Sequence, residues 1–251
     1  MTDPFASPKR RLARAKEHID DIEARAQSFS DSKPYARVIE RNARGFEEHK
    51  VKLTVDLPDR ITDIAYEAIE ALRSSLDQAT YAIAVACNSK RPDLIHFPIA
   101  DNAADFENIL NGRLKDFPPD ILALFRAFQP HQSGNTLIWA LNRIRRQSTH
   151  RLLIPVGTAS AGIFIRHMTM TSPHPLDIPP PRWNSEKNEI IFAITGPGSD
   201  LQYDVDLAFF IAFGPVEGVA GQPVLATLDA MASEGGSQPG ENVRPEEFYL
   251  N

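Results

Sequence analysis

The chain has 251 residues, of which 42% are hydrophobic and 24% are charged, and its formal net charge is −6 at pH 7. This composition is enough to bury a core, and it excludes a chain that is disordered throughout. The acidic balance also excludes a surface that coats nucleic acid over its whole area, so a nucleic-acid role would need a local basic patch.

The N-terminal residues MTDPFASPKRRLARAKEHID carry basic side chains but lack the apolar run of a signal peptide. No stretch reaches the length of about 18 apolar residues that a membrane-spanning helix needs. We therefore expect a cytoplasmic protein with no membrane contact.

Residues 9–29 have apolar side chains at alternating spacings of three and four, namely Leu12, Ala15, Ile19, Ile22, Ala26 and Phe29. This spacing predicts an amphipathic helix with a narrow apolar seam. The seam is too short for an independent coiled coil, so we expect it to pack on its own domain or on a sister subunit. If the seam does not pack on its own domain, this helix would bind a second copy of the chain or another protein partner.

A β-hairpin is predicted next, with residues 35–42 paired to residues 49–57 across the turn segment RNARG. Its second strand alternates apolar and polar residues, the apolar ones being Val51, Leu53, Val55 and Leu57. Pro58 then ends the strand, and Asp59 can cap a long helix over 60–88 whose apolar residues recur at helical spacing.

The middle of the chain is predicted to be helical, with shorter helices over 102–115, 118–128 and 135–148. After Arg151 the pattern changes to β-branched and aromatic runs, which predict strands in LLIPVGTASAGIFIRHMTM, NEIIFAIT and YDVDLAFFIAFG. The proline-rich TSPHPLDIPPPRW predicts an extended surface loop, and PVLATLDAMASE predicts a closing helix.

Strands at both ends of a helical middle predict an α+β fold. We expect one antiparallel sheet, assembled from the N-terminal hairpin and the C-terminal strands, to pack with the helical middle. The predicted organisation is a single domain over 1–234 followed by a flexible tail over 235–251, which is rich in Gly, Pro and Glu.

Four arginines and a histidine gather at the end of one predicted helix, in the segment LNRIRRQSTHR over 141–151. Arg146 and His150 are four residues apart and would share a helix face. Metal-free RNA cleavage needs a group that moves a proton near neutral pH and a fixed positive charge on the phosphate, which His and Arg supply. The alternative is that these cations only stabilise a helix C-terminus, by about 0.3–1 kcal/mol each.

An arginine followed after four to six residues by a histidine at a helix end resembles the motif of the HEPN ribonucleases, a helical family that includes many toxin and anti-phage effectors. The resemblance implies a HEPN-like bundle and metal-independent endoribonuclease activity. In that reading His150 moves the proton, Arg145 or Arg143 stabilises the phosphate, and Arg146 and Arg151 hold the RNA backbone. A polar residue often follows the arginine in the family, whereas isoleucine and arginine occupy those places here.

A second resemblance covers about residues 70–156 and concerns a set of uncharacterised bacterial and phage proteins. In these proteins a Leu-Arg-Ser-x-Leu-Asp-His helix precedes a Phe-Pro-Ile segment, a Gln-Pro element and a helix that ends near Asp-Lys-His-Arg. The matching residues are Arg73, Asp77, Phe97-Pro98-Ile99, Gln129-Pro130, His150 and Arg151, and the departures are Gln78, Ser148 and Thr149. The resemblance implies a shared fold and carries no activity with it.

Arg73 and Asp77 are four residues apart on the long predicted helix, so they can pair with each other or reach His150. In the first case they form a structural ion pair. In the second they support the site, because a carboxylate bonded to an imidazole fixes its tautomer.

No metal or organic cofactor is predicted. His167 and His174 have no carboxylate or cysteine at ligand spacing, and the chain contains neither Gly-x-Ser-x-Gly nor Gly-x-Gly-x-x-Gly.

The leading hypothesis is a metal-independent endoribonuclease of toxin or anti-phage type with RNA as its partner. The alternative is a non-enzymatic binding or regulatory subunit of a defence or phage-related complex.

Overall fold

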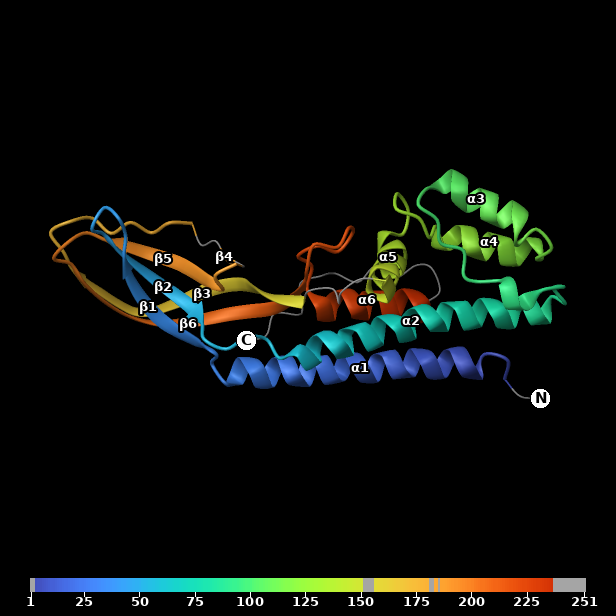
Figure 1. The fold of residues 1–251 in the computed structure, drawn as a ribbon, viewed down its shortest axis with the longest axis horizontal. Helices are drawn as coiled ribbons and strands as arrows, with labels where there is room; N and C mark the ends of the chain where they lie inside the picture. The colour runs from blue at the N-terminus through green and yellow to red at the C-terminus, as the bar shows by residue number, and fades with distance from the viewer. Residues whose placement is uncertain (1–2, 151–155, 181–182, 185, 237–251) are drawn as a thin grey trace. The chain divides into compact units, whose positions relative to one another are not determined.

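The structure, a computed structural model, describes residues 3–150, 156–180, 183–184 and 186–236 (Figure 1). The described residues form an α+β fold of helices and antiparallel strands, which confirms the predicted class. In chain order the elements are α1 (Ala6–Asp31), β1 (Tyr35–Arg41), β2 (Glu47–Leu53), α2 (Asp59–Ala86), η1 (Pro92–Leu94), α3 (Ala103–Gly112), α4 (Pro119–Phe128), α5 (Thr136–His150), β3 (Val156–Thr171), β4 (Trp183–Asn184), β5 (Glu189–Thr195), β6 (Asp200–Phe213) and α6 (Val224–Gly236).

The chain divides into two compact units. The helical unit comprises residues 1–23, 59–156 and 213–245, and the sheet unit comprises residues 24–58, 157–212 and 246–251. The expected single domain over 1–234 stays a prediction. Of the expected tail over 235–251, all but the first two residues lie outside the described part of the chain.

The sheet unit contains a four-stranded antiparallel sheet in the order β1-β2-β5-β4, so the hairpin does join later strands as predicted. The expectation of one sheet was wrong for β3 and β6, which pair with each other in a separate two-stranded sheet. Apolar residues of both sheets and of α1 share one core. Its buried members are Phe29, Val51, Leu53, Ile190, Phe192, Ala193, Leu201, Tyr203 and Leu207.

The hairpin is shorter than its pattern of alternation predicts. Strand β1 begins at Tyr35, which faces Leu53, so residues after Leu53 have no partner strand. Val55 is consequently 55% exposed and lies outside the strand. Part of the predicted proline-rich loop is also ordered by pairing, because Trp183 and Asn184 form β4 against β5.

The helical unit is built around α2, α5 and α6, which pack against one another, with the first part of α1 running along α2 (Figure 1). Five of the six residues of the predicted α1 seam are buried within one chain: Ala15, Ile19, Ile22, Ala26 and Phe29. Packing on the same chain therefore accounts for the seam, and a dimer through this helix stays a prediction. Of the helices that the structure describes, none has the length and apolar character needed to cross a bilayer.

A buried histidine in the sheet unit carries a testable pH dependence. His49 places Nδ1 3.2 Å from the Tyr203 hydroxyl and Nε2 3.1 Å from the Thr195 hydroxyl. Burial lowers the pKa of His49 below its ordinary value, and the nearby charge of Glu47 opposes this only in part. The folded protein therefore favours the neutral imidazole.

We predict that the free energy of unfolding falls as the pH is lowered below the ordinary histidine pKa of about 6.5. The sign follows because the unfolded chain takes up the proton first and is stabilised by it. Urea unfolding at about pH 7.5 and about pH 5.5 should show this loss in the wild type and a smaller loss in His49→Gln. An NMR titration in which His49 takes up its proton at or above the ordinary pKa would contradict the prediction.

Candidate functional site

A buried ion pair on α2 organises one end of the helical unit. Arg73 and Asp77 lie four residues apart on the same helix face, and their side chains are 7% and 19% exposed. Arg73 Nη1 donates to Asp77 Oδ1 at 2.5 Å, which confirms the predicted pairing. Burial lowers the pKa of Arg73, and the carboxylate of Asp77 opposes that effect.

The same two side chains bind backbone and side-chain groups of other segments. The backbone N–H of Phe97 donates to Asp77 Oδ1 at 3.0 Å, and Arg73 Nη2 donates to the Phe97 carbonyl at 3.4 Å. Arg73 Nε also donates to Asn142 Oδ1 on α5 at 3.3 Å. The pair therefore joins α2, the segment 95–99 and α5.

The segment after Phe97 is held at a second point by the loop between α4 and α5. The backbone N–H of Ala100 donates to the Pro130 carbonyl at 3.1 Å. Gln129 adopts a left-handed conformation with φ of 46°, which ends α4 and turns the chain toward Pro130. Gly134 is required in this loop, because a Cβ there would lie 2.5 Å from the Gln129 carbonyl oxygen.

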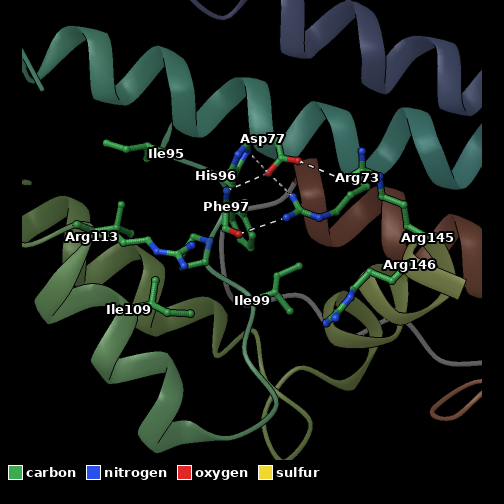
Figure 2. Close-up of a pocket in the computed structure, with 12 residues that line it drawn as sticks. Arg73, Asp77, Ile95, His96, Phe97, Ile99, Ile109, Arg113, Arg145 and Arg146 are labelled. Atoms are coloured by element: carbon green, nitrogen blue, oxygen red, sulfur yellow. Dashed lines mark hydrogen bonds and ion pairs between the residues drawn. The ribbon is translucent and has the colours of Figure 1, made fainter. Parts of the chain in front are cut away.

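A pocket of about 510 Å³ opens beside these contacts (Figure 2). Its residues come from α2, from the segment 95–99, from α3 and the residues just after it, and from α5. They are Arg73, Asp77, Ile95, His96, Phe97, Pro98, Ile99, Ile109, Arg113, Leu114, Arg145 and Arg146. We call this the arginine pocket.

The arginine pocket carries an excess of positive charge, with four guanidinium groups against one carboxylate. Arg73 is paired with Asp77, and Arg145 Nε donates to Glu70 Oε2 at 3.1 Å. Arg113 and Arg146 are exposed, and neither side chain has a hydrogen-bond or ion-pair partner among the residues the structure describes. In Figure 2 their guanidinium groups reach toward the middle of the pocket from opposite sides.

An imidazole also lies at this pocket. His96 is 62% exposed, and its Nδ1 is 3.8 Å from Asp77 Oδ1. Neither His96 nor Arg113 is predicted as a site residue from the sequence. His96 directly precedes the Phe97-Pro98-Ile99 segment of the second resemblance, which is the signal that points to it, whereas Arg113 has no such signal.

Of the residues predicted for the site, the structure brings together Arg73, Asp77, Arg145 and Arg146. Arg143 is not among the lining residues, because it is two positions from Arg145 and faces another side of α5. Its Nη2 lies 3.1 Å from Glu217 Oε2, and its guanidinium lies over the Trp139 ring at 5.5 Å from the centroid.

The side chain of His150 and the whole of Arg151 fall outside the described residues. The pairing of either predicted arginine with His150 therefore stays a prediction. Within the described ranges, no three His, Cys, Asp or Glu side chains gather closely enough to hold a metal ion. What the described part of the pocket offers is a set of groups suited to an anion.

We predict that Asp77→Asn lowers the free energy of unfolding by about 3 kcal/mol, because it leaves the buried charge of Arg73 without its carboxylate. Urea unfolding followed by far-UV circular dichroism would measure the change. The double variant Arg73→Met/Asp77→Leu should recover part of the loss, since it removes both charges.

The matched control is Glu107→Gln, which breaks the exposed pair of Glu107 with Arg126 and should change the free energy of unfolding far less, because water screens both charges. An Asp77→Asn effect as small as that of the control would mean that the buried pair does not stabilise the helical unit.

Comparisons with protein-family models, with curated proteins and with solved structures gave no match to this chain. The two resemblances described from the sequence stay hypotheses. The arginine pocket and the chemistry of the residues that line it are the features of the described chain that point to a function.

Proposed function

We propose that the arginine pocket binds a phosphate group of RNA. The observation that carries the proposal is that Arg113 and Arg146, which have no partner among the described residues, converge on one pocket of a chain that is acidic overall. An arginine that has no carboxylate partner is free to form two parallel hydrogen bonds to a phosphate. Arg73 and Arg145 are already paired with carboxylates, so in this proposal they make the electrostatic potential of the arginine pocket positive and shape its walls.

The apolar part of the pocket supports a nucleotide over a bare inorganic anion. Ile95, Ile99 and Ile109 line it together with the arginines and offer a surface for a sugar or base. The volume of about 510 Å³ lies within the range of about 300–1,000 Å³ that small-molecule sites occupy. RNA suits such a site when it is single-stranded, because unpaired bases can be splayed out of the stack.

Arg113→Ala and Arg146→Ala should each weaken the binding of uridine 5′-monophosphate and of single-stranded RNA by about tenfold, which corresponds to about 1.4 kcal/mol. Both residues are exposed, so the free energy of unfolding should change by less than about 0.5 kcal/mol. Isothermal titration calorimetry and thermal unfolding would measure the two effects.

The matched control is Arg10→Ala, which removes an exposed arginine of α1 that does not line the pocket. It should leave the affinity unchanged. Equal losses in all three variants would indicate a diffuse charge effect and would contradict a specific phosphate site.

Metal-independent RNA cleavage is the second candidate function, and His96 is the observation that favours it. An imidazole beside a carboxylate and several guanidinium groups can move a proton while the cations stabilise charge on the phosphate. The carboxylate of Asp77 lies on the Nδ1 side of the ring, at 3.8 Å, which leaves Nε2 to act on the RNA 2′-hydroxyl. In this proposal the protein is a toxin or anti-phage ribonuclease, and His150 is the alternative proton carrier.

Cleavage of this kind should persist in excess EDTA, should spare single-stranded DNA and should leave 2′,3′-cyclic phosphate ends, because the 2′-hydroxyl of the RNA is the nucleophile. His96→Ala should abolish cleavage and keep RNA binding within about fivefold of the wild type. The assay compares wild type, His96→Ala and His150→Ala on mixed RNA and DNA with end-group analysis of the products.

Loss of activity in His150→Ala alone would assign the proton transfer to His150 in place of His96. Activity that disappears with EDTA would rule out this mechanism. RNA binding without any products would favour the non-enzymatic binding or regulatory subunit.

A further inference from the structure

A second pocket of about 470 Å³ adjoins the arginine pocket within the helical unit. Two residues, Ile95 and Arg113, line both pockets, so the two spaces are adjacent at these side chains. In Figure 2 both residues lie on the side of the arginine pocket away from Arg146. The second pocket therefore extends the first in the direction away from α5.

The second pocket is also basic. Its lining includes three cationic side chains and one carboxylate. The cations are Lys90, Arg91 and Arg113, and the carboxylate is that of Asp116. Arg91 is partly neutralised by Asp93, at 3.2 Å between Nη2 and Oδ2. Lys90 is exposed, and no described residue pairs with its ammonium group.

Apolar side chains accompany these cations. Leu94 is 55% exposed and lines the second pocket, and Ile95 lies between the two spaces. Proteins that follow a single strand combine a positively charged groove with side chains on which bases stack, most often aromatic ones. Here the aliphatic side chains of Leu94 and Ile95 would offer the apolar surface for the bases. A mononucleotide has one phosphate site to fill and would use only one of the two pockets.

We infer that the two pockets form one track for single-stranded RNA, in which successive phosphates bind on either side of Arg113. This inference rests on the proposed function, because the arginine pocket supplies the first phosphate site. It adds that the ligand is a polynucleotide strand and that Lys90 binds a phosphate next to the one at Arg146. Arg113 lies between them and contributes to both.

The test measures how affinity depends on ligand length and on salt. Uridine 5′-monophosphate and 2′-O-methyl oligouridylates, namely a dinucleotide, a tetranucleotide and an octanucleotide, are titrated into the wild type, Lys90→Ala and Arg146→Ala. The 2′-O-methyl group prevents cleavage during the measurement, because no 2′-hydroxyl is available to attack. Each titration is repeated between about 50 and about 200 mM salt.

The expected result is that the tetranucleotide binds more tightly than the monophosphate. Lys90→Ala should weaken tetranucleotide binding by about fivefold and reduce the salt slope by about 0.7, the value for one lost contact to a single strand. Binding of the monophosphate should be unchanged in Lys90→Ala and weakened in Arg146→Ala. Lys52→Ala, which removes an exposed lysine of β2, should match the wild type.

A tetranucleotide that binds no more tightly than the monophosphate would overturn the track and leave the arginine pocket as a single phosphate site. Equal loss of both ligands in Lys90→Ala would also overturn it, because Lys90 would then not act at a separate phosphate. Failure of every probe to bind would overturn the proposed function itself, and the track with it.

Discussion

The buried pair of Arg73 and Asp77 is the interaction on which the rest of the helical unit's pocket depends. A charged guanidinium is stable in a buried position only when a carboxylate and further acceptors surround it. Those acceptors come from two other parts of the chain, the carbonyl of Phe97 and the side chain of Asn142. Satisfying one buried charge therefore sets the positions of the segment 95–99 and of α5 relative to α2.

This arrangement divides the cations of the pocket into two groups. Arg73 and Arg145 are each held by a carboxylate, and they keep the walls basic and in place. Arg113 and Arg146 are exposed lining residues with no partner among the described residues. A phosphate can therefore bind these two groups at little cost in desolvation. Because the chain as a whole is acidic, this local excess of positive charge would direct an anionic ligand to one place.

The helices and strands follow from local patterns, and the sequence predicts most of them to within a few residues. The α1 seam and the spacing of Arg73 and Asp77 on α2 depend only on helical periodicity, which a single segment carries. The end of β2 at Leu53 cannot be predicted from the pattern of its own segment, because it depends on where β1 begins. The separate pairing of β3 with β6 is likewise a choice among equally apolar strands.

The candidate site shows the same division between local and long-range information. The sequence by itself determined that cations cluster near the end of α5 and that Arg73 can pair with Asp77, since both statements concern neighbours on one helix. Only the tertiary structure decided that Arg145 and Arg146 share a pocket with His96 and Arg113, while Arg143 lies against Trp139 and Glu217. The physical reason is that the lining residues come from segments far apart in the chain, joined by tertiary contacts such as those of Arg73 with Phe97 and Asn142. Such contacts leave no periodic trace in the sequence.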